Sequence, residues 1–95
     1  MTNDAELPRA PSILHDAHDL IHGERQSDYG HPSKNFDRLA KLWSVVLGTE
    51  TTPDQVVLCL VALKLARTVE NPNKRDSWLD MAGYIGIWEM LHQDK

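Results

Sequence analysis

Two carboxylates stand four residues apart in the segment KRDSWLDMAGY, residues 74–84. Asp76 and Asp80 are expected to share one face of a helix, because positions i and i+4 are neighbours on a helix surface. The residues that follow, up to Leu91, are mainly apolar, which indicates a helix that packs against others. Carboxylates gathered in such a place are typical ligands of Mg²⁺, a hard cation that prefers oxygen atoms and phosphate partners.

A structural interpretation of the same acids stays open. Asp76 would then be a capping or first-turn anion favoured by the helix dipole, and either carboxylate would pair with a base on the preceding helix. Lys64 and Arg67 are suitable partners, because at 100° per residue they fall on the side of their helix that carries Leu60. Buried ion pairs usually add no net stability over apolar residues. Several charges directed towards one interior therefore favour a magnesium site, with the basic residues holding phosphate.

The segment ERQSDYGHPSKNF, residues 24–36, is a second group of chemically useful residues. Turn chemistry alone accounts for Gly30, for Pro32 and for Ser33 as a helix cap. It does not require the neighbouring residues Tyr29, His31 and Asn35, whose side chains can stack on or hydrogen-bond to a base or sugar. Both interpretations of this segment stay open.

Other reactive side chains are given structural interpretations. His15, His18 and His22 share a sector of the first helix with Asp19, and three imidazoles on one face suggest a transition-metal site. That sector lies opposite the apolar stripe, which favours a solvated face. Cys59 lies in an apolar helix without a basic neighbour, so we expect an inert core thiol.

Four helices are expected to position these residues. The first begins after Ser12 and ends at Gly23 or continues through Glu24, which would then fall on the apolar stripe of this helix, with Asp28 four residues later. The second runs from residue 33 to a stop at Gly48. The fourth covers residues 76–92.

The third helix has the strongest start signal, since Thr52, Pro53 and Gln55 form a capping box with proline at the first helical position. It ends before Asn71-Pro72. Its body, VVLCLVALKLA, is apolar on nearly all sides, which is typical of a helix surrounded by other helices. The predicted fold is an all-α, four-helix bundle-like domain over residues 12–95, preceded by a flexible arm over residues 1–11.

Length and composition restrict the class of protein. A chain of 95 residues makes one domain with a thin core, so we expect a homo-oligomer. The net charge of −4 argues against nucleic-acid binding. One cysteine, no signal peptide and no apolar run long enough to span a membrane predict a cytoplasmic protein without membrane contact.

Three segments in this order, ERQSDYGHPSKNF, LKLAR and KRDSWLDMAGY, resemble a family of small proteins encoded by actinobacterial phages and prophages. The resemblance extends from about Gly23 to Trp88. More distantly, the layout is similar to nucleotide-modification-associated phage domains and to the MazG-like all-α nucleoside triphosphate pyrophosphohydrolases. Those enzymes are helical bundles, often dimers or tetramers, in which acids from two helices bind Mg²⁺. They cleave a nucleotide between its α- and β-phosphates.

The resemblance implies a role for each residue group. The implied Mg²⁺ ligands are Glu24, Asp28, Asp76 and Asp80, of which Glu24 and Asp80 also have catalytic roles. The implied phosphate-binding residues are Lys64 and Arg67. Beside what the resemblance implies, Tyr29, His31, Asn35 and Tyr84 are the remaining candidate substrate-binding residues. MazG-like enzymes have a Glu-x-x-Glu pair and a Glu-x-x-Asp pair, and this chain has neither. Its two acidic pairs are spaced by four residues instead.

The expected function is that of a phage-encoded, Mg²⁺-dependent nucleoside triphosphate pyrophosphohydrolase, a dimer or tetramer that acts on a nucleotide pool in the host cytoplasm. Two other functions stay open. One is a non-catalytic oligomer that binds or sequesters a nucleotide. The other is a purely structural or interaction bundle, in which charged pairs specify assembly.

Overall fold

A computed structural model describes residues 10–93 of the protein. The side chain of Glu24, and most of the predicted arm over residues 1–11, lie outside the described residues. The described chain is all-α, as predicted. It contains four long helices, α1 (Ile13–His22), α3 (Pro32–Leu47), α4 (Pro53–Glu70) and α5 (Arg75–His92), and a short helix α2 (Glu24–Tyr29) that was not predicted.

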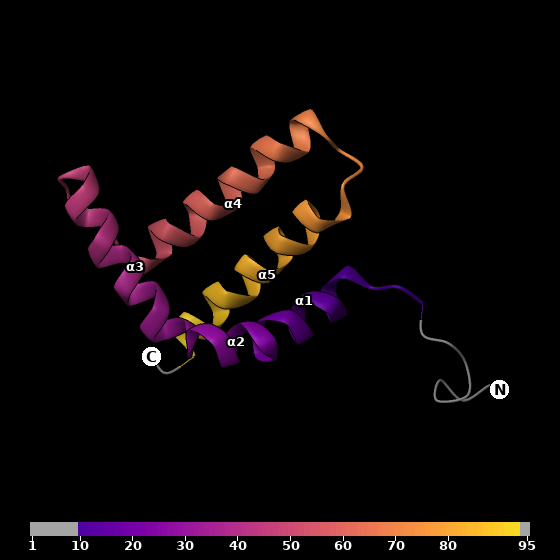
Figure 1. Ribbon diagram of the computed structural model, residues 1–95, viewed down its shortest axis with the longest axis horizontal. Coiled ribbons are helices and arrows are strands. Elements are labelled where there is room, and N and C mark those ends of the chain that lie inside the picture. The colour runs from indigo at the N-terminus through magenta and orange to yellow at the C-terminus, as the bar shows by residue number, and fades with distance from the viewer. Residues whose placement is uncertain (1–9, 94–95) are drawn as a thin grey trace.

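Helix α5 lies at the centre of the molecule (Figure 1). Helix α4 runs antiparallel along one side of α5, and α1 runs along the other side. Helix α3 crosses the end of this layer and contacts both α4 and α5. Within the described chain, the backbone of α1 does not come close to that of α4 or of α3. The four long helices therefore form an open layer with one crossing helix, rather than a closed bundle.

Local signals explain most of the helix ends. The Ser12 side chain accepts from the His15 amide, and Thr52 and Gln55 form the predicted capping box in front of Pro53. Gly48 ends α3 with φ 70°, a left-handed conformation that suits glycine. These three predictions are confirmed.

The sequence left two possible ends for the first helix and placed the cap of the next long helix at Ser33. The first helix ends at Gly23, one of the two predicted ends, and does not continue through Glu24; a Cβ atom at Gly23 would lie 2.8 Å from the Asp19 carbonyl oxygen. Glu24 instead opens α2, so it is not part of the α1 stripe. Ser33 is not the cap of α3: His31 is the cap, and its Nδ1 accepts from the Ser33 amide at 3.1 Å. A histidine acceptor replaces the usual hydroxyl or carboxylate, and sequence patterns do not include that case.

The core is built from residues of the four long helices, α1, α3, α4 and α5. Its fully buried side chains are Phe36, Val56 and Ile87, and Ile21 and Met90 pack beside them. Helix α1 comes close to α5 at two glycines: a Cβ atom at Gly86 would lie 2.8 Å from Ile21 Cδ1, and one at Gly83 would lie 3.4 Å from Ile21 Cγ2. These glycines allow the two helices to approach closely.

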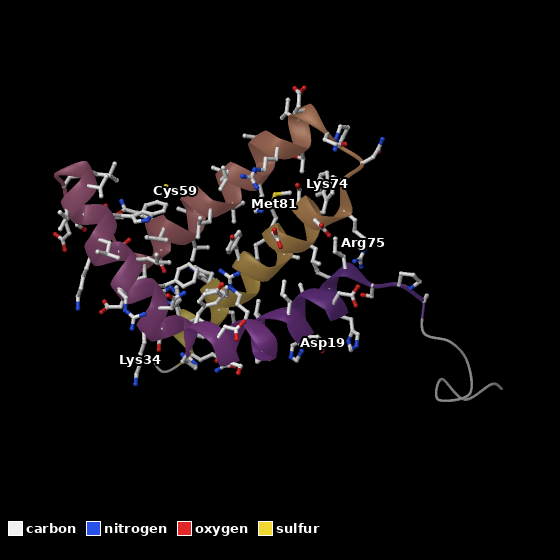
Figure 2. All side chains as sticks on the ribbon, in the orientation of Figure 1. Asp19, Lys34, Cys59, Lys74, Arg75 and Met81 are labelled. Atoms are coloured by element: carbon white, nitrogen blue, oxygen red, sulfur yellow. The ribbon has the colours of Figure 1, made fainter. Side chains whose placement is uncertain are left out.

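The prediction that α4 is surrounded by other helices is wrong. Only its inner side, which includes Val56, Val57 and Thr68, is buried, because α5 and α3 are the helices that contact it. Cys59 is exposed rather than buried in the core, and Figure 2 shows it on the side of α4 turned away from α5. None of the described helices is both long and apolar enough to cross a membrane.

Candidate functional site

A pocket lies between the C-terminal end of α4 and the N-terminal end of α5. Its volume is about 400 Å³. We call it the α4–α5 pocket. Six charged residues line it, three basic and three acidic: Lys64, Arg67, Lys74, Glu70, Asp76 and Asp80. Figure 2 shows Lys74 at the start of α5, near the end of α4. The helix periodicity thus brought together four residues that line one pocket: Lys64, Arg67, Asp76 and Asp80.

Lys64 and Asp80 form the inner wall of this pocket. Lys64 Nζ lies 2.7 Å from Asp80 Oδ2, with 15% of the lysine side chain and 32% of the aspartate side chain exposed. Partial burial strengthens the attraction between the two charges relative to a fully solvated pair. The pair corresponds to the structural interpretation of Asp80, and it also holds both groups at the edge of an open cavity.

Arg67 and Asp76 do not face the interior as predicted; both are exposed. They lie in the last turn of α4 and the first turn of α5, next to the short loop that joins the two helices. Periodicity predicts on which side of a helix a residue lies, but not whether another element covers that side at the helix end. Their position leaves both side chains accessible at the rim of the pocket.

Arg25 is a residue of this region that the sequence analysis missed. Its guanidinium carbon lies 5.6 Å from the ring centre of Tyr29 and 5.8 Å from that of Tyr84, so it contacts both rings. Arg25 also lines a small cavity with Asp80 and Tyr84. The i, i+4 spacing of Arg25 and Tyr29 was a signal that the sequence offered.

The predicted loop residues divide into two groups. Asn35 and Tyr29 line a second small cavity, again with Arg25, so Tyr29 and Tyr84 reach a common neighbour from α2 and α5. His31 has a local structural role, since its Nδ1 accepts from both the amide and the hydroxyl of Ser33. Tyr29, at 59% exposed, is accessible to a ligand.

The structure describes three of the four predicted magnesium ligands. Asp28 is exposed on α2, and the Glu24 side chain lies outside the described part of the structure. Among the described residues, no three His, Cys, Asp or Glu side chains come together in a way that would hold a metal ion. Asp76 and Asp80 are two carboxylates of one pocket, and the magnesium site stays a prediction.

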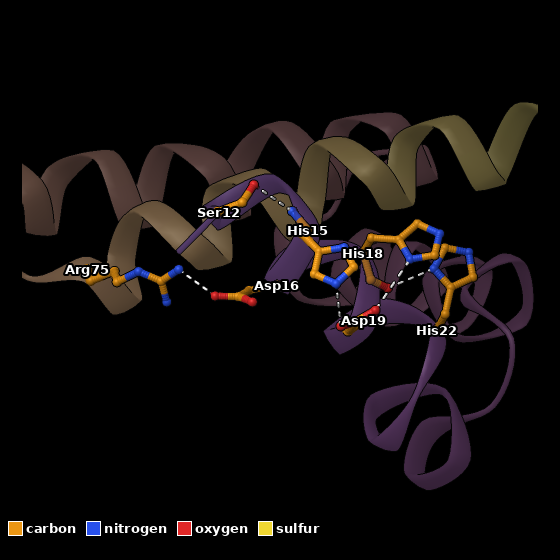
Figure 3. A network of polar contacts seen from close by, with 7 residues as sticks. All are labelled: Ser12, His15, Asp16, His18, Asp19, His22 and Arg75. Atoms are coloured by element: carbon orange, nitrogen blue, oxygen red, sulfur yellow. Dashed lines mark hydrogen bonds and ion pairs between the residues drawn. The ribbon is translucent and has the colours of Figure 1, made fainter. Parts of the chain in front are cut away.

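The three histidines of α1 lie on a solvated face, as expected. His15 and His18 are each within salt-bridge distance of Asp19, at 3.5 and 3.7 Å, and the rings of His18 and His22 stack at 4.2 Å (Figure 3). On the same helix Asp16 forms an ion pair with Arg75 at the start of α5. This ion pair joins the start of α1 to the start of α5.

A second polar cavity lies at the opposite end of α4, with a volume of about 560 Å³. There His92 Nε2 lies 2.9 and 3.1 Å from the two carboxylate oxygens of Asp54, with Lys34 and Asp37 nearby. His92 and Asp54 are separated by 38 positions in the sequence, which leaves no local pattern from which this pair could be predicted. It joins the end of α5 to the first turn of α4.

Comparisons with known proteins identify relatives among mycobacteriophages. The chain is 41% identical over 81 residues to the Gene 55 protein of Mycobacterium phage L5, covering 84% of this chain and 52% of that protein. It is 42% identical over 83 residues to the Gene 55 protein of Mycobacterium phage D29, covering 87% of this chain and 55% of that protein. The chain thus spans about half the length of these curated relatives.

These relatives confirm the resemblance to a phage protein family. No solved structure matches the chain, and the more distant resemblance to MazG-like enzymes stays a prediction. The family described as a domain of unknown function, DUF6378, matches residues 12–92, and the protein belongs to this family.

Proposed function

We propose that this protein binds a nucleoside triphosphate together with Mg²⁺ in the α4–α5 pocket and hydrolyses it between the α- and β-phosphates. One observation carries the proposal: a 400 Å³ pocket in which three cations and three carboxylates line an open cavity. Phosphate oxygens require cations, and a magnesium ion that accompanies a nucleotide requires carboxylates. The pocket has both.

The basic residues would hold the phosphates. Arg67 and Lys74 are exposed at the rim and reach a ligand without breaking a contact of the core. Lys64 is bound to Asp80 at 2.7 Å, so a phosphate that attracts Lys64 would release the Asp80 carboxylate. Binding would then prepare an acidic group in the pocket for chemistry.

The carboxylates suit a cation that arrives with the nucleotide. Mg²⁺ is usually bound by one or two protein carboxylates, with waters and substrate phosphates completing its coordination, and Asp76 and Asp80 meet that requirement. Asp28, with Glu24, would supply the first acidic pair implied by the family resemblance. When bound, the cation would neutralise phosphate charge and make water a better nucleophile.

The protein's own side chains would accept the proton and orient the nucleotide. Water attacks the α-phosphorus, the bond from that phosphorus to the bridging oxygen breaks, and pyrophosphate leaves. Asp80, once released from Lys64, or Glu24 accepts the proton of the water. At the other side of Asp80, Tyr29, Asn35 and Tyr84 would bind the base and sugar beside Arg25.

Pyrophosphate release from a panel of ribo- and deoxyribonucleoside triphosphates, with and without Mg²⁺, tests the proposal. We expect turnover that requires the cation and falls by at least about 100-fold in Asp80→Asn, the scale lost when a general base is removed. Asp37→Asn is the matched control, because Asp37 pairs with Lys41 on the exposed face of α3. Absence of turnover with every nucleotide would contradict hydrolysis.

A second candidate is nucleotide binding without hydrolysis. The observation that favours it is the short Lys64–Asp80 contact, which neutralises the carboxylate on which chemistry would depend. Equilibrium binding of the same nucleotides separates the two functions. Binding that Lys64→Met and Arg67→Met weaken, in the absence of any product, would support the non-catalytic function.

A further inference from the structure

An apolar surface covers the outer side of the molecule at the end of α3 and along α4. We call it the outer apolar face. Its eight exposed aliphatic side chains are Leu42, Val45, Val46, Leu47, Leu58, Leu63, Leu65 and Val69. Two of them, Val45 and Val46, are 82% and 83% exposed although they lie in the last turns of a long helix.

The outer side of α4 has no polar stripe. A helix that faces water normally has charged and polar residues opposite its buried side. Here that side contains the aliphatic side chains of Leu58, Leu65 and Val69, together with Ala62 and Cys59. From residue 55 to residue 63 the helix contains no charged residue at all. A contiguous apolar surface of this kind marks a place where another surface, such as a second protein, makes contact.

We propose that a second copy of this chain covers the outer apolar face, related by a two-fold axis. In this dimer the projecting end of α3 of each copy packs against the outer side of α4 of its partner. The two parts of the face lie on different helices of one chain, so one symmetric contact covers both parts in both copies. Such a reciprocal contact is the usual form of a two-fold interface. The inference does not depend on the proposed function.

The size and the charge of the face favour a second copy over a chemically different partner. The eight residues are each between 45% and 83% exposed, so together they can supply a large part of the roughly 800 Å² that each partner buries in a standard interface. The protein has a net charge of −4, which would repel an identical copy, but the contact surface itself is uncharged. A partner selected by charge would find nothing there to recognise.

The shape of the molecule agrees with this assignment. Figure 1 shows that the C-terminal half of α3 projects beyond α4 and α5. The four aliphatic side chains at this end, Leu42, Val45, Val46 and Leu47, all stay more than half exposed within their own chain. Placed on the α4 of a second copy, it would complete the enclosure of α4 that its all-round apolar sequence predicts.

Sedimentation velocity and light scattering on the full chain test the dimer. We expect the unmodified protein to be dimeric across the micromolar range and Val46→Glu and Leu58→Glu to be monomeric with unchanged helical circular dichroism. Leu14→Glu is the matched control, since Leu14 is 73% exposed on α1, on the other side of α5. It should remain dimeric.

Three outcomes would overturn the inference. These are a monomeric unmodified protein, a dimer that survives both outer-face variants, and a dimer that Leu14→Glu dissociates. A second readout avoids variants that fail to fold. Cys59 is exposed in the single chain and would be covered in the dimer, so its reaction with a thiol reagent should accelerate as the unmodified protein is diluted. A rate that does not change, while the dimer dissociates, would also contradict this interface.

Discussion

Lys64 of α4 and Asp80 of α5 join the two longest helices through a contact of 2.7 Å at the wall of the α4–α5 pocket. Each charged group is partly withdrawn from water, and the opposite charge of its partner compensates for the lost hydration. The same pair therefore has two consequences. It determines how much stability is lost when either charge is removed. It also means that a phosphate ligand bound by Lys64 must separate Lys64 from Asp80.

The first prediction concerns stability. Lys64→Met leaves the Asp80 carboxylate partly buried without its partner, so we expect a loss of about 1–3 kcal/mol in the free energy of unfolding. Adding Asp80→Leu should recover most of this loss, because replacing both partners removes the uncompensated charge. Urea unfolding of the two single variants and the double variant measures the coupling. The exposed pair Asp37–Lys41 is the control, for which we expect a coupling below about 0.5 kcal/mol.

The second prediction concerns the approach of α1 to α5. A Cβ atom at Gly86 would lie 2.8 Å from Ile21 Cδ1, whereas one at Gly83 would have ordinary contact at 3.4 Å with Ile21 Cγ2. Gly83→Ala should be neutral or stabilise the protein by up to about 1 kcal/mol through helix propensity. Gly86→Ala should be less stable than Gly83→Ala by about 1–2 kcal/mol, because Ile21 is buried and must move.

A rescue variant makes this comparison specific. Ile21→Val removes the Cδ1 atom that a residue-86 methyl group would meet. In chemical denaturation, Gly86→Ala should therefore cost less free energy in the Ile21→Val background than in the unmodified protein. Equal costs in the two backgrounds would show that the α1–α5 contact is not the origin of the effect.

The third prediction concerns the start of α4. Thr52 Oγ1 accepts from the Gln55 amide at 3.2 Å, and the Gln55 side chain accepts from the Thr52 amide at 2.8 Å. Thr52→Ala should lower the free energy of unfolding by about 1 kcal/mol. Thr49→Ala, in the exposed loop before α4, should change it by less than half as much. Thermal and urea unfolding of both variants provide the comparison, and equal effects would refute the capping contribution.

The sequence was most informative where a single residue type has a local physical role. Threonine followed by proline and glutamine predicted the start of α4, and glycine predicted the end of α3, because these side chains act on their own backbone. Gly23 was ambiguous for the opposite reason. Its role depends on a close approach to the Asp19 carbonyl, which is visible only once the chain is folded.

The site was partly predictable for a related reason. Periodicity brought Lys64 and Asp80 onto facing sides of α4 and α5, since angle around a helix follows from sequence number. It did not distinguish them from Arg67 and Asp76, which have suitable angles but lie exposed at the helix ends. Arg25 was missed although its spacing from Tyr29 was a local signal, because its other partner, Tyr84, belongs to a distant helix. Enclosure and cross-helix contact are properties of the assembled fold.

The last prediction concerns Arg25, which lies between the rings of Tyr29 and Tyr84 and lines a cavity with Asp80. If this is the base-binding end of the proposed site, Arg25→Met should weaken nucleoside triphosphate binding by about tenfold, or about 1.4 kcal/mol. Its effect on inorganic pyrophosphate binding should be small, because the phosphates would lie at Lys64 and Arg67. Titration calorimetry with both ligands measures the difference, and Arg38→Met on the exposed surface of α3 is the control. Equal weakening of both ligands would instead place Arg25 at the phosphates, and unchanged binding of both would remove it from the site.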